Sequence, residues 1–160
     1  MIKELIETEK ELRNDANRYN YEILDKLRLV FHSILLAYKK NSQELIGLYN
    51  IIDVGAKDLM IRFDGGSVLD KYWIDNEMLF LHYYYRDNSE DTGTFKIPLE
   101  VVEKNLECKN NEVVLSWYNQ KLDECRERYK EHLEKMKTKQ EEEELAELKR
   151  LQEKYKDRIL

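Results

Sequence analysis

The sequence has few residues that break regular structure, with only five glycines and one proline. These residues supply most tight turns and helix ends, so their scarcity predicts long helices. Motifs for catalysis are also missing. No Gly-x-Ser-x-Gly element is present, and the Gly65-Gly66 pair leads into a predicted strand instead of opening a helix, as a phosphate-binding loop would. We therefore predict a protein that is not an enzyme.

Cysteines and long apolar runs are equally scarce. Cys108 and Cys125 are the two cysteines, and neither a CxxC nor an HxxxH spacing occurs that would hold a zinc ion. We expect no metal and no other cofactor. No apolar stretch approaches the roughly 18 residues of a membrane span, and the N-terminal MIKELIETEKEL is charged and amphipathic, unlike a signal-peptide core. The expected location is the cytoplasm, with reduced thiols and no membrane partner.

Charge, by contrast, is abundant. Charged residues make up 38% of the chain, the formal net charge is −6 and the pI is about 5.3. Basic and acidic residues alternate near the C-terminus, which is typical of a solvated helix face, and the block Glu141–Glu144 would repel phosphates. Direct nucleic-acid binding is therefore not expected. One alternative is a small acidic inhibitor of the mobile-element type, which mimics nucleic acid and blocks a nucleic-acid-processing enzyme.

Apolar residues with helical spacing fill both ends of the chain. We predict an N-terminal helical arm over residues 1–40, with a stripe that broadens from Ile23 to Tyr38, and a short second helix within 41–50, with Ser42 as its N-cap. One very long helix of coiled-coil type is predicted from about Asn111 to the C-terminus. Its apolar seam has alternating spacings of three and four, and shifts register after KTKQEEEE: Leu115, Tyr118, Leu122, Cys125, Tyr129, His132 and Met136, then Leu145, Leu148, Leu151, Tyr155 and Ile159.

These two seams need cover. Antiparallel pairing of the two arms within one chain is the simplest way to bury both. The main alternative is a homodimer that pairs the C-terminal arms. Residues 137–160 extend beyond anything the N-terminal arm can reach, so this segment is expected to be solvated, bound to a partner or dimerised.

The apolar period changes to two in the middle of the chain, which predicts an antiparallel meander. We place its strands at 58–63, 68–74, 78–86 and 94–97, with a solvated acidic loop over 87–93 and a short helix after Pro98. The predicted fold class is α+β: a four-stranded antiparallel β-meander flanked by a long N-terminal helix and a very long coiled-coil-like C-terminal helix. We expect one elongated domain over 1–160, with the arm at 1–40, the short helix and meander head at 41–108, and the long helix at 109–160.

The strand predicted within MLFLHYYYRD is the most unusual stretch. Alternation gives it two faces, neither of them polar: Leu79, Leu81, Tyr83 and Tyr85 on one, and Met78, Phe80, His82 and Tyr84 on the other. The helical arms can cover one face. We expect the other, which carries Phe80 and Tyr84, to meet a second protein surface.

Eleven tyrosines and two tryptophans gather mainly in the meander and at the start of the long helix. One interpretation is an aromatic core that includes Trp73 and Trp117. The other is a partner surface, since Tyr and Trp give a large contact area at a low entropic cost. The candidate partner-binding residues are Tyr72, Phe80, His82, Tyr83, Tyr84 and Tyr85.

These features favour a protein–protein interaction module that is homo-oligomeric. It would engage a macromolecular partner of unknown identity through the β-head or the charged C-terminal helix. A ligand-binding domain or enzyme with a site near the tyrosine-rich strand is a second alternative.

Overall fold

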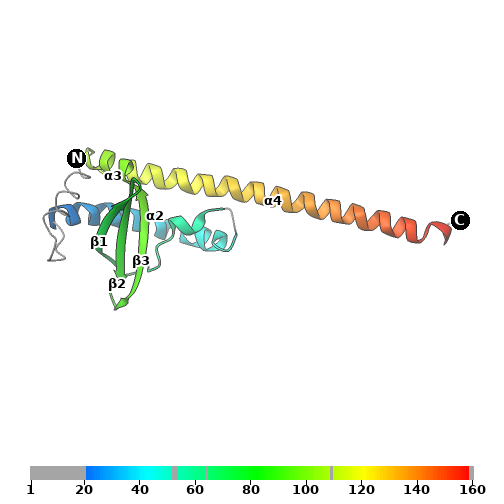
Figure 1. Ribbon diagram of the computed structural model, residues 1–160, viewed down its shortest axis with the longest axis horizontal. Coiled ribbons are helices and arrows are strands. Elements are labelled where there is room, and N and C mark those ends of the chain that lie inside the picture. The colour runs from blue at the N-terminus through cyan, green and yellow to red at the C-terminus, as the bar shows by residue number, and fades with distance from the viewer. Residues whose placement is uncertain (1–20, 52–53, 64, 109, 159–160) are drawn as a thin grey trace.

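The computed structural model describes residues 21–158, except 52–53, 64 and 109. Within that part of the chain the fold is α+β, with three antiparallel strands and three α-helices, one of them the long C-terminal helix (Figure 1). The elements in chain order are α2 (Tyr21–Leu48), η1 (Ala56–Leu59), β1 (Ser67–Asp75), β2 (Met78–Tyr85), β3 (Asn88–Pro98), α3 (Leu99–Leu106), α4 (Glu112–Lys154) and η2 (Lys156–Arg158).

Helix α2 covers the second half of the predicted N-terminal arm, and residues 1–20 lie outside the described residues. The predicted separate helix at 41–50 is wrong, because α2 continues without a break to Leu48. Asn41 and Ser42 do not cap a new helix. Their side chains donate hydrogen bonds back to the carbonyls of Ala37 (2.8 Å) and Lys39 (3.1 Å), which lets polar residues stay within a helix.

The predicted strand at 58–63 is also wrong. Its alternating apolar residues are buried as a strand's would be, but η1 occupies the first part and no sheet partner follows. Tyrosine hydroxyls bind this backbone instead. The Tyr118 hydroxyl donates to the Leu59 carbonyl at 2.7 Å, and the Arg62 N–H donates to the Tyr83 hydroxyl at 2.9 Å. Side chains thus satisfy main-chain groups that a fourth strand would have paired.

The sheet has the order β1-β2-β3, and both connections are tight turns. Asn76 and Glu77 join β1 to β2 with φ of 49° and 61°, the left-handed geometry of a two-residue hairpin turn. The predicted loop at 87–93 is wrong, because β3 already begins at Asn88. Gly93 was interpreted as a loop residue, yet a Cβ there would lie 2.4 Å from the Tyr83 ring, so this glycine allows close packing within a strand.

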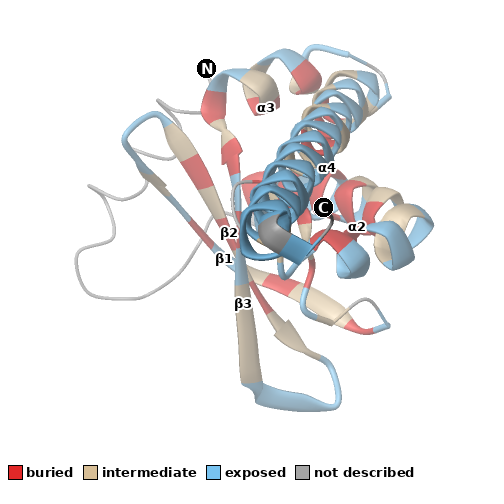
Figure 2. Ribbon diagram, turned by 90° about the vertical axis from the view of Figure 1, so that its right-hand side faces the viewer, coloured by how far each residue is buried: buried red, intermediate tan, exposed pale blue. Residues whose placement is uncertain are grey.

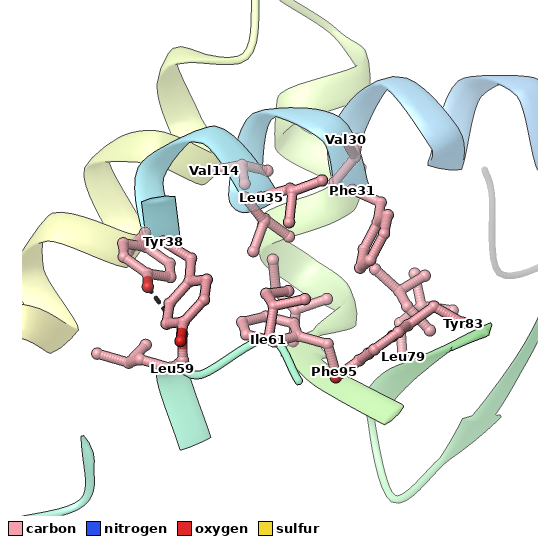
Figure 3. Close-up of a cluster of buried hydrophobic side chains, with 14 of the residues drawn as sticks. Val30, Phe31, Leu35, Tyr38, Leu59, Ile61, Leu79, Tyr83, Phe95 and Val114 are labelled. Carbon is pink, nitrogen blue, oxygen red and sulfur yellow. Dashed lines mark hydrogen bonds between the residues drawn. The ribbon is translucent and has the colours of Figure 1, made fainter. Parts of the chain in front are cut away.

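Helices α2 and α4 lie on the same face of the sheet, and α3 sits at one end of it (Figure 2). Figure 3 shows the core between them. Its side chains come from each of these layers: Val30, Phe31 and Leu35 from α2, Leu79, Tyr83 and Phe95 from the sheet, Ile61 from the connection and Val114 from α4.

The two helices run side by side in the same direction, so the expected antiparallel pairing of the arms within one chain is wrong (Figure 1). Asn111, just before α4, donates to the Ser33 hydroxyl at 2.6 Å, and further along Arg126 binds Glu44. The chain returns past the end of α2 and through three strands. It therefore enters α4 at the end of the body where α2 begins.

The long C-terminal helix is confirmed, and only its first third belongs to the core. Its last fully buried residue is Cys125. Arg126 forms an ion pair with Glu44, and Tyr129 still packs against the core; beyond these residues the helix leaves the body and extends away from it (Figure 1).

Candidate interaction surfaces

One face of the three-stranded sheet is turned away from α2 and α4, and we call it the outer sheet face (Figure 2). Strand register fixes its composition. Successive rows across β1, β2 and β3 are Asp75–Met78–Pro98, Trp73–Phe80–Lys96, Lys71–His82–Thr94 and Val68–Tyr84–Thr92. Each member of these rows is exposed or half-buried. Met78, Lys96 and Pro98 line a pocket together with residues of α4, and the described part of the chain leaves the rest of this face open to solvent.

An aromatic pair stands at the centre of the outer sheet face. Trp73 and Phe80 occupy opposite positions on neighbouring strands, with ring centroids 5.4 Å apart and planes 5° from parallel. Such cross-strand aromatic pairs stabilise a sheet, yet Trp73 keeps 37% of its surface exposed. The interpretation that placed Trp73 in the core is therefore wrong.

A β-bulge produces this arrangement. The register of β1 against β2 shifts between Leu69 and Lys71, with Asp70 as the extra residue. The bulge lets Leu69 and Tyr72 both face the core although they are an odd number of residues apart. The bulge thereby turns Lys71 and Trp73 outward. Without it, strict alternation that starts from the buried Leu69 would place Lys71 and Trp73 on the core face.

The bulge also positions Asp70 beside His82. Oδ1 of Asp70 lies 2.6 Å from Nδ1 of His82, and both side chains are partly exposed. Because a carboxylate can only accept a hydrogen bond, Nδ1 carries the proton of this contact. The pair fixes the orientation of the imidazole 6.4 Å from the Trp73 ring.

The six candidate residues predicted for partner binding divide between the core and the surface. Phe80, His82 and Tyr84 lie on the outer sheet face, as the alternation predicts. Tyr72 and Tyr83 are buried and are not accessible to a partner in this fold. Burial raises the pKa of Tyr83, whose hydroxyl binds the Arg62 N–H.

Tyr85 takes a third position at the end of β2. It is half-buried, and its ring stacks on Phe63 with centroids 5.1 Å apart. Its contact with the Asp87 carboxylate raises its pKa above the ordinary value. This side chain therefore belongs to the turn end of the β2–β3 hairpin, away from the Trp73–Phe80 pair.

The second candidate surface is residues 126–154 of α4, which we call the free stretch. Its first residues, Arg126, Arg128 and Tyr129, still contact the body, and the rest of the stretch extends from it. Several large apolar side chains are exposed on it, among them Met136 at 56%, Leu145 at 58% and Leu148 at 51%. Cations and anions are equally numerous in this stretch and form blocks. Lys135, Lys137 and Lys139 precede Glu141–Glu144, and Lys149 and Arg150 follow.

A groove of about 870 Å³ opens where α4 leaves the body. Gly47 and Leu48 at the end of α2 line one side, and Tyr129 and Leu133 of α4 line the other. The bidentate contact between Arg126 and Glu44, at 2.6 and 2.9 Å, spans the groove and holds the helices together. This contact lowers the pKa of Glu44. Sequence reasoning missed the groove, because it depends on the direction in which α2 and α4 run.

The described residues also bear on metal binding and on membrane insertion. No group of three or more His, Cys, Asp or Glu side chains lies close enough to hold a metal ion there. In the same part of the chain, no helix is both long and apolar enough to span a bilayer.

No protein-family model, curated protein or solved structure matches this chain. Any functional conclusion therefore depends on its own surfaces.

Proposed function

We propose that this chain is a non-enzymatic protein-interaction module that self-associates through the free stretch of α4 and binds a protein partner through the outer sheet face. The observation that carries the proposal is the free stretch itself. A helix this long, with its leucines in solvent, gains stability from burying an apolar side against another surface. Exposed patches of large apolar residues typically mark such contacts.

The outer sheet face supports the second half of the proposal. It combines a half-exposed Trp73–Phe80 pair with an oriented His82, and Tyr84 continues the aromatic surface along β2. Large, rigid aromatic side chains of this kind dominate the binding energy of protein interfaces. Their fixed rotamers mean that little conformational entropy is lost on binding.

Light scattering after size exclusion, at two concentrations, tests self-association. The full chain is expected to behave as a dimer, and the double variant Leu148→Gln/Leu151→Gln as a monomer with unchanged secondary structure. A matched control is Leu36→Gln/Ile46→Gln, because Leu36 and Ile46 are exposed residues of α2 on the body. The control is expected to remain dimeric. A monomeric full chain at high micromolar concentration would end this half of the proposal.

Substitutions on the outer sheet face test partner binding. Trp73→Ser and Tyr84→Ser are expected to abolish capture of a host protein while the protein stays folded, because neither side chain is fully buried. The unfolding midpoint is expected to fall for Trp73→Ser, which loses its stacking on Phe80, and to change little for Tyr84→Ser. Tyr49→Ser is the control, since Tyr49 is an exposed aromatic residue at the end of α2. If Tyr84→Ser unfolds the protein instead, this strand face is part of the core.

A further inference from the structure

We propose that two copies of this chain pair antiparallel along the free stretch of α4, in the register that places Gln140 of both chains together on the two-fold axis. The inference rests on the proposed self-association and specifies its geometry. Three independent features of the chain favour this register.

The first feature is the length of helix that is free to pair. The body contacts α4 as far as Tyr129, which packs against the core one turn beyond the Arg126–Glu44 ion pair, and the helix ends at Lys154. In a register centred on residue 140, Lys154 of each copy lies beside Arg126 of the other, so the pair extends to the edge of each body. Greater overlap would drive the end of the partner helix into α2. The shared length is roughly 42 Å, about four heptads, which is enough for a stable two-stranded coiled coil.

The second feature is the order of the charge blocks. In a parallel pair, Glu141–Glu144 of one chain would lie beside the same four glutamates of the other, and Lys135–Lys139 beside their own copies. Both contacts are repulsive. In the antiparallel register centred on Gln140, Lys137 and Lys139 lie beside Glu141–Glu144 of the second copy, and this happens twice by symmetry. Charges of this kind select the orientation of paired helices.

The third feature is the position of the apolar residues. Tyr129, Gln140 and Leu151 are eleven residues apart, and so are Leu133 and Glu144. An eleven-residue repeat keeps its members on one face of an almost straight helix. In this register Tyr129 lies against Leu151 of the second copy, and Leu133 lies beside its Glu147 and Leu148. The apolar contacts therefore fall at the two ends of the pair.

Gln140 is exposed and lies at the polar centre of this face, where its Nε2 donates to Oε1 of Glu144 at 3.2 Å. Opposite its own copy, its amide can instead donate to and accept from the second amide. A single polar pair of this kind favours one register of a coiled coil. The groove between α2 and α4 also limits the register. In the proposed register, Leu151 near the end of the second copy's helix lies beside Tyr129 and Leu133, which line one side of this groove.

Disulfide trapping in the full chain tests the register. Cys108→Ser provides the background, because Cys108 is the exposed cysteine and Cys125 is buried. In this background Gln140→Cys alone is expected to form a covalent dimer under mild oxidation. Glu147→Cys alone and Leu133→Cys alone are expected to stay at the background level. An equal mixture of Glu147→Cys and Leu133→Cys is expected to crosslink, because these two positions face each other.

Geometry makes these outcomes distinct. In the proposed register the two copies of position 147 are separated along the helix axis by ~21 Å, far beyond the ~7 Å between Cα atoms that a disulfide can span. A parallel pair would instead bring every position beside its own copy, so Glu147→Cys alone would crosslink, and that result overturns the proposal. Gln140 is a surface residue of a helix, so its substitution does not threaten folding.

Light scattering of the same samples distinguishes the register from self-association itself. If the protein is a dimer that Gln140→Cys does not trap, the pair has another register, so the proposed register fails while the proposed self-association stands. If the protein is a monomer, both the register and the self-association are refuted.

Discussion

Replacing Tyr118 with phenylalanine is the sharpest test of how this fold is held together. The Tyr118 ring is completely buried, and its hydroxyl donates a 2.7 Å hydrogen bond to the carbonyl of Leu59, which is also buried. Burial raises the pKa of Tyr118, so the hydroxyl stays protonated and able to donate. Phenylalanine keeps the ring and leaves the carbonyl without its partner. An unsatisfied buried group of this kind costs about 1–3 kcal/mol.

The measurement is urea unfolding followed by tryptophan fluorescence and by circular dichroism. We expect the midpoint to fall with the slope unchanged, and the melting temperature to fall by about 2–4 °C for each kcal/mol in a chain of this size. Tyr129→Phe is the control, because it removes the same hydroxyl from a half-buried ring about three turns further along the same face of α4. Equal midpoints for Tyr118→Phe and Tyr129→Phe would refute the view that tyrosine hydroxyls replace strand pairing in the segment after η1.

Three other predictions follow from buried contacts. Gly93→Ala is expected to destabilise the protein by about 1–3 kcal/mol, because its Cβ would lie 2.4 Å from the Tyr83 ring, whereas Gly47→Ala, with nothing within 4 Å, should stabilise α2 by about 0.5–1 kcal/mol in the same urea titration. Since burial raises the pKa of Tyr83, the folded state holds this proton where an unfolded tyrosine, with a pKa near about 10, loses it. Stability measured against pH should therefore fall as the pH rises above about 10, and less steeply in Tyr83→Phe. With Ellman's reagent, exposed Cys108 should react quickly and Cys125 only as the protein unfolds, because Cys125 is buried and burial raises its pKa; one fast phase for both thiols would contradict this packing.

Much of the central strand was predictable from sequence, because alternation depends only on local geometry. The division of β2 into a face with Leu79 and Leu81 and a face with Phe80, His82 and Tyr84 needed no knowledge of the partner strands. The hairpin turn at Asn76 was equally local. The long C-terminal helix was predictable for the same reason, since its seam and lack of breakers lie within one continuous segment.

The errors arose where a local pattern had two possible partners. Leu59 and Ile61 alternate as in a strand. Whether the backbone of this segment pairs with a sheet or with tyrosine hydroxyls depends on Tyr83 and Tyr118, which lie far away in the sequence. The bulge at Asp70 is another case, because one inserted residue reverses the facing of everything after it. Alternation counted from Leu69 would place Trp73 on the core face, whereas the bulge places it on the outer sheet face. The direction of α2 against α4 was also not predictable, because it depends on the path of the chain through η1, the three strands and α3 between them.

The direction of these helices also determines how the two proposed surfaces relate. Because α2 and α4 run the same way on one face of the sheet, the outer sheet face points away from both, and α4 leaves the body beyond the end of α2 (Figures 1 and 2). Self-association along the free stretch therefore leaves the outer sheet face uncovered. An antiparallel pair would hold its two sheets at opposite ends of a helical rod, separated by at least the ~42 Å of the shared stretch. Two identical sites at a fixed separation bind a partner with repeated epitopes more tightly than either site alone, without any new contact. Pairing and partner binding are thus compatible uses of one chain, because each depends on residues that the other leaves free.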